Sequence, residues 1–450
     1  MAEILSEVEL NHILATLRTS PLEWVGNEEW TKQMSQLEQL NVQAAYEASQ
    51  GGEELVRDAL VESEKMSTLV HELILLELWR KEVLPRLMKL GTPQTSFQIY
   101  MVLFNEANVC NILDTTLFGQ DACEALNDSA IDLVDYVIRI LTHLCSGEVS
   151  APKSNDFKEA LSSWKPGQDL PHFPEESTTD EICRLEQEIL FQIAMKCISI
   201  MRYLSDHLDF LVLGVSTRLT ITQDIPMLLV QLLKSKPWYR RENNQVFQGS
   251  EWVEEDMEAM PKLEAQTWIA LYNMLSKKSC SDKYELHHYR QKVLTSLGGQ
   301  INACIIHQLP ILEPLKDWLV KLQVNSNVAS APEKNLILIE SVAEIEKALH
   351  NHYDDKYERI AEEQRELFLG ETTEAWQSEA AKLLETLESD AARSLLPEKV
   401  RRADPVCGHC GANNPSQRCS RCKKVRYCNQ DCQVQDWRSK HRFSCSPSES

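Results

Sequence analysis

Seven of the fourteen cysteines in this 450-residue chain lie in its last tenth, and their spacing constrains the fold more than any other feature. Six of them form three close pairs, and a histidine stands four positions before the seventh. Seven thiols and one imidazole make eight ligands, which is the number that two tetrahedral zinc ions require. These candidate ligands are Cys407, Cys410, Cys419, Cys422, Cys428, Cys432, His441 and Cys445.

Two other uses of clustered cysteines fit the sequence less well. Disulfides need an oxidising compartment, but the acidic, amphipathic N-terminus does not have the pattern of a secretory signal peptide. An iron–sulfur cluster needs thiolates but gives the histidine at this spacing no role. We therefore predict two structural zinc ions with filled coordination shells, and such sites have no open position for catalysis.

The spacing within each pair indicates how that pair binds a metal. Two cysteines separated by two residues bind one metal through a tight turn. Cys428 and Cys432 are four residues apart, which places both on one face of a helical turn, and the last pair has the same spacing. Spacing alone leaves open whether the four pairs bind in sequence order or interleave. His409 lies between the first two cysteines, and we expect it to be exposed rather than a ligand.

The order of the ligands, with the segment YCNQDCQVQDW around the third pair, resembles the MYND zinc finger family. The chain departs from the family pattern in one place, because three residues rather than two separate Trp437 from His441. The resemblance implies two zinc ions bound in an interleaved manner. It assigns Cys407, Cys410, Cys428 and Cys432 to the first zinc, and Cys419, Cys422, His441 and Cys445 to the second.

The same resemblance implies a protein-binding module. MYND fingers bind short proline-containing peptides in a shallow groove, and Gln433 and Trp437 match the groove positions. An exposed indole offers a flat apolar face to proline rings, and an amide can hold a peptide backbone. The alternative is that Trp437 only packs over the zinc sites. The finger is basic, but no helix in it presents a row of base-reading side chains, so we predict no nucleic-acid partner.

The rest of the chain has the pattern of helices around a core. Hydrophobic residues make up 43% of the sequence and Gly and Pro are scarce. Apolar residues recur every three or four positions in segments such as 129–147, 178–207 and 262–277. We therefore predict an all-α body, for which an α-solenoid of stacked helix pairs is one possible arrangement. The segment 245–253 is expected to form a short hairpin.

Proline-rich and polar breaks divide this body. Gly147 follows one helical pattern at the position of a C-terminal cap, and Ser129 with Asp132 resembles a capping box at its start. The predicted regions are an N-terminal helical region (1–145), a linker or long loop (146–178), a second helical region (179–332), an exposed helical arm (333–398) and the zinc finger (399–446).

Charge and missing motifs exclude several functions. The net charge is −22, and because residues 399–450 carry +7, residues 1–398 carry −29. An acidic body repels phosphate backbones, which excludes broad nucleic-acid binding by the body. No apolar run approaches the ~20 residues that cross a bilayer, so we predict no membrane insertion. No phosphate-binding loop, nucleophile elbow or kinase motif occurs, and we predict that the protein is not an enzyme.

The resemblance extends beyond the finger. The segments LVDYVIRILT, KPWYRRE, WIALYNML and RCSRCKKVRYC are similar, in order and distance, to a family of MYND-finger proteins that assist preassembly of axonemal dynein arms. This implies a non-catalytic, co-chaperone-like scaffold of the cytoplasm, including centriolar satellites and the apical cytoplasm of ciliated cells. The implied partners are a leucine-rich-repeat dynein assembly factor, Hsp90-type chaperones and axonemal dynein chains as clients. The alternative is a nuclear corepressor adaptor that binds proline-containing peptides through its finger.

Overall fold

The chain forms two compact units, which span residues 1–378 and 379–450. The first is the helical body, and the second contains the zinc finger. The computed structural model describes residues 5–51, 54–151, 176–256, 259–324, 341–370, 409–410, 417–418, 426–437 and 441.

Helices build almost all of the described body, which confirms the predicted all-α class. Pro85 stands in the first turn of α5 (Leu84–Leu90) and cannot donate to the helical ladder, and the chain just before it forms a π-helical turn, η2 (Trp79–Val83). The elements before residue 151 are α1 (Glu7–Thr16), η1 (Leu22–Trp24), α2 (Glu28–Gln50), α3 (Leu55–Glu62), α4 (Met66–Leu78), η2 (Trp79–Val83), α5 (Leu84–Leu90), α6 (Phe97–Thr116), α7 (Gln120–Glu124) and α8 (Ser129–Ser146).

The second half of the body continues with helices and one small sheet. Its elements are α10 (Thr178–Asp206), α11 (Leu213–Thr217), η3 (Arg218–Thr222), α12 (Ile225–Ser235), β1 (Tyr239–Arg240), β2 (Gln245–Gln248), β3 (Glu251–Glu254), α13 (Lys262–Ser276), α14 (Lys278–Ser281), α15 (His288–Thr295), α16 (Ala303–Gln308), η4 (Pro310–Leu312), α17 (Glu313–Val324), α18 (Glu344–Tyr353), α19 (Tyr357–Glu363) and α20 (Arg365–Leu369).

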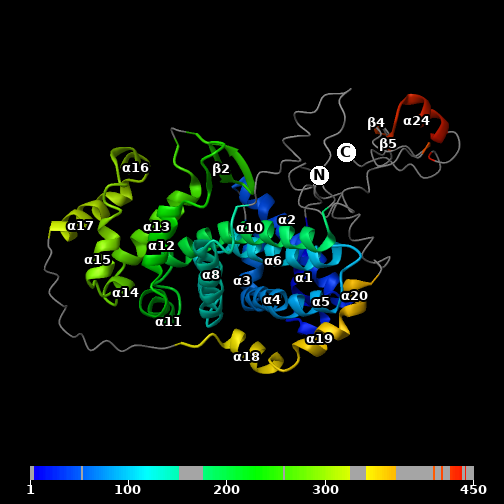
Figure 1. The fold of residues 1–450 in the computed structure, drawn as a ribbon, viewed down its shortest axis with the longest axis horizontal. Helices are drawn as coiled ribbons and strands as arrows, with labels where there is room; N and C mark the ends of the chain where they lie inside the picture. The colour runs from blue at the N-terminus through cyan, green and yellow to red at the C-terminus, as the bar shows by residue number, and fades with distance from the viewer. Residues whose placement is uncertain are drawn as a thin grey trace. The chain divides into compact units, whose positions relative to one another are not determined.

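Helix α10 is the centre of the body (Figure 1). The Ser177 side chain caps its start by accepting the N–H of Asp180, and apolar residues on more than one face let it pack against α6, α8 and α13. Because α6 and α8 precede the break at 146–178 and α13 follows it, the two predicted helical regions share one core. A solenoid of helix pairs touching only their neighbours would not have such a shared central helix.

The predicted hairpin is present as β2 and β3. Gly249 and Ser250 connect the strands with φ values of 59° and 68°, as a tight two-residue hairpin turn requires. Trp252 of β3 and Phe247 of β2 pack their rings on Phe191 of α10, with centroid distances of 5.8 and 5.2 Å. The hairpin therefore extends the core of α10 rather than standing free.

Buried ion pairs tie the central helices together. Arg80 donates to both carboxylate oxygens of Glu106, at 2.8 and 3.0 Å, and the hydroxyl of Tyr136 donates to the same carboxylate at 2.9 Å. Nearby, Arg139 of α8 donates to both carboxylate oxygens of Glu77 of α4, at 3.1 and 2.6 Å. Arg80, Glu106, Tyr136 and Glu77 are buried and Arg139 is 24% exposed, so the buried charges depend on their partners.

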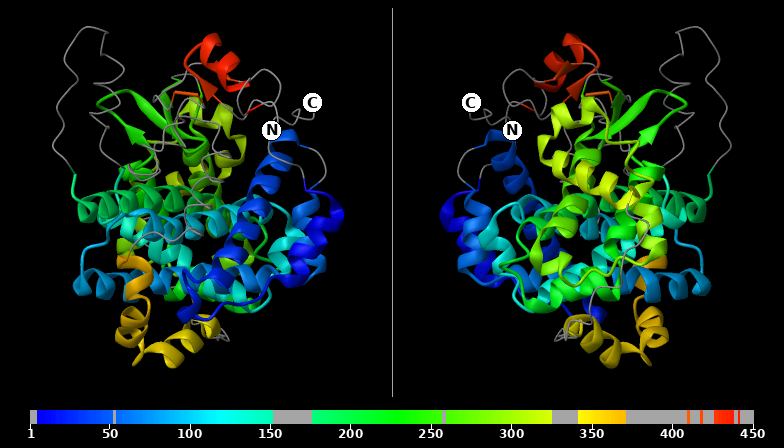
Figure 2. Two further views of the ribbon diagram at one scale, coloured as in Figure 1. Left: turned by 90° about the vertical axis from the view of Figure 1, so that its right-hand side faces the viewer. Right: turned by 90° about the vertical axis from the view of Figure 1, so that its left-hand side faces the viewer.

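Residues 341–370 correct the prediction of an exposed arm. They do not form one long helix but three short ones, α18, α19 and α20, which contact α4, α5, η2 and α8. Figure 2 shows them in gold along one edge of the body. Tyr353, Tyr357, Ile360 and Phe368 are at most 4% exposed, because their helical face is covered by the first half of the body. Residues 333–340 and 371–398 of the predicted arm lie outside the described residues.

One of the two caps expected for the helix at 129–147 is present and the other is not. Gly147 ends α8 in the left-handed conformation, at φ 83°, as predicted. The capping box of Ser129 and Asp132 is not formed, since the Ser129 hydroxyl donates to the carbonyl of Leu126. The Asp132 carboxylate instead accepts the N–H of Glu346 at 2.9 Å.

Every helix among the described residues is too short or too polar to span a bilayer.

Candidate metal centre

A short ribbon and one helix position the described part of the finger. Strands β4 (Gln417–Arg418) and β5 (Arg426–Tyr427) pair antiparallel, and α24 (Gln430–Asp436) follows directly. Asn429 caps this helix, because its side-chain oxygen accepts the N–H of Cys432 at 2.9 Å. The cap sets the start of the helix between the two cysteines of the third pair.

Three of the predicted ligands lie together. The Sγ atom of Cys410 is 3.6 Å from that of Cys428 and 3.9 Å from that of Cys432. A zinc ion bound about 2.3 Å from each sulfur in tetrahedral geometry holds its sulfurs about 3.8 Å apart. A disulfide would bring two sulfurs to about 2.05 Å. The three thiols therefore fit a tetrahedral zinc ion.

The arrangement also bears on which pairs share a metal. Cys410 belongs to the first pair in the sequence, and its neighbours here belong to the third pair. In the interleaved scheme the first and third pairs bind the same zinc ion, as these positions suggest. If the pairs bound in sequence order, the first and second pairs would share one zinc ion. Within the described residues, these thiols are the one group of potential ligands close enough to share an ion. The predicted ligands Cys407, Cys419, Cys422 and Cys445 lie outside the described residues.

The remaining described side chains form a small core around His441. His441 is 4% exposed, and its ring lies 5.9 Å from Trp437 and 6.2 Å from Tyr427, centroid to centroid. The hydroxyl of Tyr427 donates to the carboxylate of Asp436 at 2.8 Å, and both residues are buried. His441 is thus held in the interior of the finger, as a metal ligand would be, while His409 is exposed as expected.

Gln433 and Trp437 lie on the same face of α24, because they are four residues apart. Both are partly exposed, and Val434 beside them is 40% exposed. Asn429, Tyr427 and Asp436 support the site and were not among the residues predicted from the sequence. An Asn before the acidic first turn of a helix is a readable capping signal, but the contact of Tyr427 with Asp436 is tertiary.

Comparisons with known proteins agree with this geometry. Residues 407–445 match the MYND finger family. A protein of Drosophila melanogaster, "Zinc finger MYND domain-containing protein 10 homolog", is 28% identical over 466 residues, which cover 99% of this chain and 99% of that protein. No solved structure matches the chain.

Shorter similarities link the chain to proteins of Arabidopsis thaliana. An F-box protein is 44% identical over 48 residues, or 9% of this chain and 14% of that protein. Ubiquitin carboxyl-terminal hydrolase 19 is 49% identical over 39 residues, or 9% of this chain and 6% of that protein. The chain therefore contains a MYND finger, a metal-binding domain, at residues 407–445, and its whole length, body and finger together, is similar to the zinc finger MYND domain-containing protein 10 homolog of Drosophila melanogaster.

Proposed function

We propose that this protein is a non-catalytic cytoplasmic adaptor for the preassembly of axonemal dynein arms, with its MYND finger as a protein-interaction module. The observation that carries the proposal is the similarity along 99% of the chain, which includes the helical body as well as the finger. Its partners in this role are a leucine-rich-repeat assembly factor, Hsp90-type chaperones and axonemal dynein chains. The role in dynein assembly comes from the resemblance of the whole sequence, and the finger supports the adaptor function.

The finger in this proposal holds two structural zinc ions. The first is bound by Cys407, Cys410, Cys428 and Cys432, and the meeting of Cys410 with the third pair supports this set. The second is bound by Cys419, Cys422, His441 and Cys445, and the buried position of His441 supports its role. Zinc bound in this way cross-links distant parts of a short chain and stabilises its fold.

The surface of α24 around Trp437 is the proposed peptide site. Gln433, Val434 and Trp437 form a partly exposed face on one side of the helix. The indole provides the flat apolar surface that a proline ring contacts, and the Gln433 amide can exchange hydrogen bonds with a peptide backbone. The short helix is held at its start by Asn429 and at its end by the ring contact of Trp437 with His441.

Purification of the tagged full-length protein from ciliating cells tests this function. Cytosol and nuclei are separated first, and the co-purifying proteins are identified by mass spectrometry. Dynein arm chains and chaperones in the cytosolic fraction are the expected result. Chromatin proteins and corepressor subunits from the nuclear fraction would overturn the proposal and favour the nuclear adaptor.

A variant separates the finger from the body in this experiment. Trp437→Ala is expected to reduce the finger-dependent partner at least tenfold, and the zinc content of the variant is measured alongside because Trp437 also contacts the ring of His441. Trp318→Ala, which changes a half-buried tryptophan of α17 in the body, is the matched control and should retain that partner. Equal losses in both variants would show that the Trp437 face is not the docking site.

A further inference from the structure

Residues 341–370, named the strap here, occupy a groove formed by the first half of the body. The groove is lined by η1, α4, η2, α5 and α8, which all end at least 195 positions before the strap begins. The strap therefore binds a surface that is complete before the chain reaches it. Such an arrangement raises the question of whether the groove can bind another segment of the same chemistry.

Buried polar contacts show that the groove recognises particular side chains. The Tyr353 hydroxyl accepts the N–H of Leu22 at 3.0 Å and donates to Glu23 at 3.1 Å. The Gln364 amide donates to the carbonyl of Leu22 at 3.0 Å and accepts the indole N–H of Trp79 at 2.9 Å. Trp79 belongs to the π-helical turn η2, and turns of this kind are frequent at functional sites.

Two glycines let the ends of the strap approach the body backbone closely. A Cβ atom on Gly214 would stand 1.8 Å from the Oγ atom and 2.6 Å from the Cβ atom of Ser341. A Cβ atom on Gly26 would stand 2.6 Å from the Phe368 ring. The ring of Phe368 also lies 5.0 Å from that of Trp79. The body surface is thus shaped to receive both ends of the strap.

Charge complementarity defines the chemistry of the occupant. The strap carries eight Asp or Glu against four Lys or Arg, so it is acidic, and the body as a whole is acidic too. Two acidic residues of the strap nevertheless lie beside arginines of the body. Arg139 donates to Glu346 at 2.8 Å, and Arg86 lies 3.7 Å from Glu358. The Arg86 guanidinium also lies 5.3 Å above the ring of Tyr357. One contact has the opposite polarity, since Glu23 of the body lies 3.7 Å from Arg359 of the strap.

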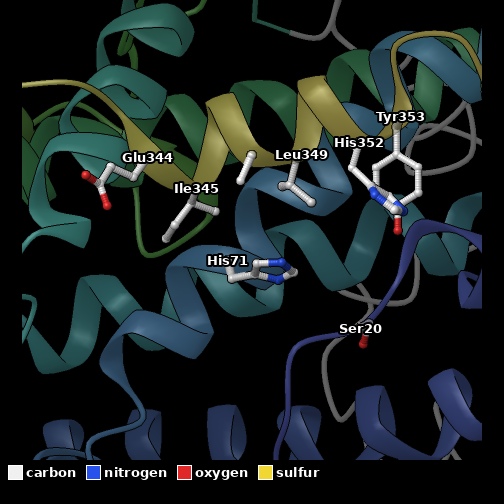
Figure 3. A pocket seen from close by; sticks show the side chains of 8 residues that line it. Ser20, His71, Glu344, Ile345, Leu349, His352 and Tyr353 are labelled. Atoms are coloured by element: carbon white, nitrogen blue, oxygen red, sulfur yellow. The ribbon is translucent and has the colours of Figure 1, made fainter.

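The first helix of the strap does not fill the space beneath it. A hollow of about 350 Å³ lies between α18 and α4 and opens to solvent. Figure 3 shows Ile345 and Leu349 of α18 on one side of it and His71 of α4 on the other. Hydrogen bonds hold α18 near both ends, where the N–H of Glu346 donates to Asp132 and the Tyr353 hydroxyl accepts the N–H of Leu22.

The three helices of the strap have 10, 7 and 5 residues, and helices of this length are not stable alone in water. Detached from the groove, the strap would lose its helical structure and gain conformational entropy, which offsets much of the contact free energy. A segment whose contact free energy is nearly offset by its conformational entropy detaches locally before the whole domain unfolds. The buried Leu22 amide and Trp79 indole would then meet water instead of remaining without partners.

We propose that the surface beneath the strap is a recognition groove for acidic segments that form two short helices with an aromatic residue on each side of the turn between them, as Tyr353 and Tyr357 do here, and that the strap is its resident, autoinhibitory occupant. A partner segment with the spacing of Tyr353 and Tyr357 and with acidic residues toward Arg86 and Arg139 displaces it. The proposal concerns the body alone and does not depend on the peptide site of the finger.

Hydrogen exchange of the full-length protein tests whether the strap opens separately. Amides of residues 345–369 are expected to exchange together and at least tenfold faster than the central amides of α10. Gly214→Ala should speed the exchange of the strap a further tenfold without changing α10, because the new Cβ displaces Ser341. Gly299→Ala, which meets no atom within 4 Å, is the matched control. Equal exchange of strap and α10 would overturn the proposal.

A synthetic peptide of residues 344–369 then tests recognition in trans, by fluorescence anisotropy with the full-length protein. The peptide lacks Ser341, so it does not meet the substituted position in Gly214→Ala. We expect it to bind Gly214→Ala at least tenfold more tightly than wild type or Gly299→Ala, and high salt should weaken binding. A peptide with Tyr353 and Tyr357 replaced by Ser should not bind. Failure of the native peptide to bind Gly214→Ala, despite faster strap exchange, would show that the groove accepts its occupant only in cis.

Discussion

The helical body and the zinc finger are stabilised in different ways. The body encloses large apolar side chains, including Trp30, Trp79, Trp238 and Trp268, each at most 1% exposed. Among the described residues of the finger, by contrast, the buried side chains are those of Tyr427, Asp436 and His441. Three buried side chains cannot offset the entropy of ordering the described part of the finger, whereas bound zinc can. The helical body and the zinc finger should therefore unfold independently, under different treatments.

Removal of zinc is expected to have the largest effect and to unfold the finger alone. Structural zinc contributes about 10–16 kcal/mol of binding free energy in small finger peptides. A chelator should abolish amide protection in residues 430–436, while α10 keeps its protection and far-UV circular dichroism changes little. Acid should act similarly, since protonated thiols release zinc. Protection of residues 430–436 that survived complete removal of zinc would contradict this comparison.

Phe191→Ala should damage the body without affecting the finger. The ring is fully buried between α10 and the hairpin, and its loss leaves a cavity that costs about 3–5 kcal/mol. Urea unfolding followed by circular dichroism measures this loss, and the zinc content should stay that of wild type. Phe210→Ala removes the same side chain at a site that is 48% exposed and should change stability by less than about 0.5 kcal/mol. A loss of zinc in Phe191→Ala would mean that the regions are coupled.

Glu77 gives the body a dependence on pH. Burial alone would raise the pKa of this carboxyl, but hydrogen bonds and charge from Arg139, with Lys81 and Arg80, outweigh burial and lower the pKa to about 2 from 4.5. Since the folded pKa is depressed, the stabilisation is complete above pH 4.5 and is lost as the pH falls toward 2.

Glu77→Gln should accordingly reduce the free energy of unfolding by about 3 kcal/mol at pH 7, and the difference from wild type should shrink below pH 4.5. Urea titrations at several pH values measure it. Glu29→Gln, at a side chain that is 68% exposed, is the control and should behave like wild type. A difference that did not vary between pH 7 and pH 3 would argue against an ionised Glu77.

Tyr427→Phe has the smallest expected effect and tests whether the finger has any core beyond its metal. It removes the hydroxyl that donates to Asp436, which is worth about 1 kcal/mol. Zinc affinity, measured by competition with a chelator, should fall about fivefold while the zinc content at saturation is unchanged. Tyr289→Phe, at a position 62% exposed in the body, should have no effect. If Tyr427→Phe lost one whole equivalent of zinc, Tyr427 would be required for metal binding and not only for the stability of the finger.

The elements that could be predicted from the sequence are those specified by neighbouring residues. The limits of α10 follow from Ser177 at its start and from apolar residues at a helical period. The hairpin at 245–253 is marked by its Gly–Ser turn, and the third pair of the finger by its spacing of four residues. Each of these signals acts within a few residues, so no knowledge of the fold is needed to interpret it.

The incorrect predictions concern residues whose partners are distant. The Asp132 carboxylate suits a capping box by its position in the sequence, but it binds the N–H of Glu346, 214 residues away. The helical pattern after residue 333 predicted an arm in solvent, because nothing local shows that Tyr353 reaches Leu22. The break at 146–178 likewise gave no sign that α10 packs on the helices before it.

The sequence by itself determined the helical class of the body, the spacing of the zinc ligands and the faces that each helix can bury, because periodicity, capping and ligand spacing are local properties of the chain. Only the tertiary structure decided which helices share α10, that Cys410 meets the third pair of cysteines, and that the strap fills a groove on the body. These arrangements depend on how apolar surfaces and buried charges hundreds of residues apart satisfy one another, and no segment of the sequence contains that information alone.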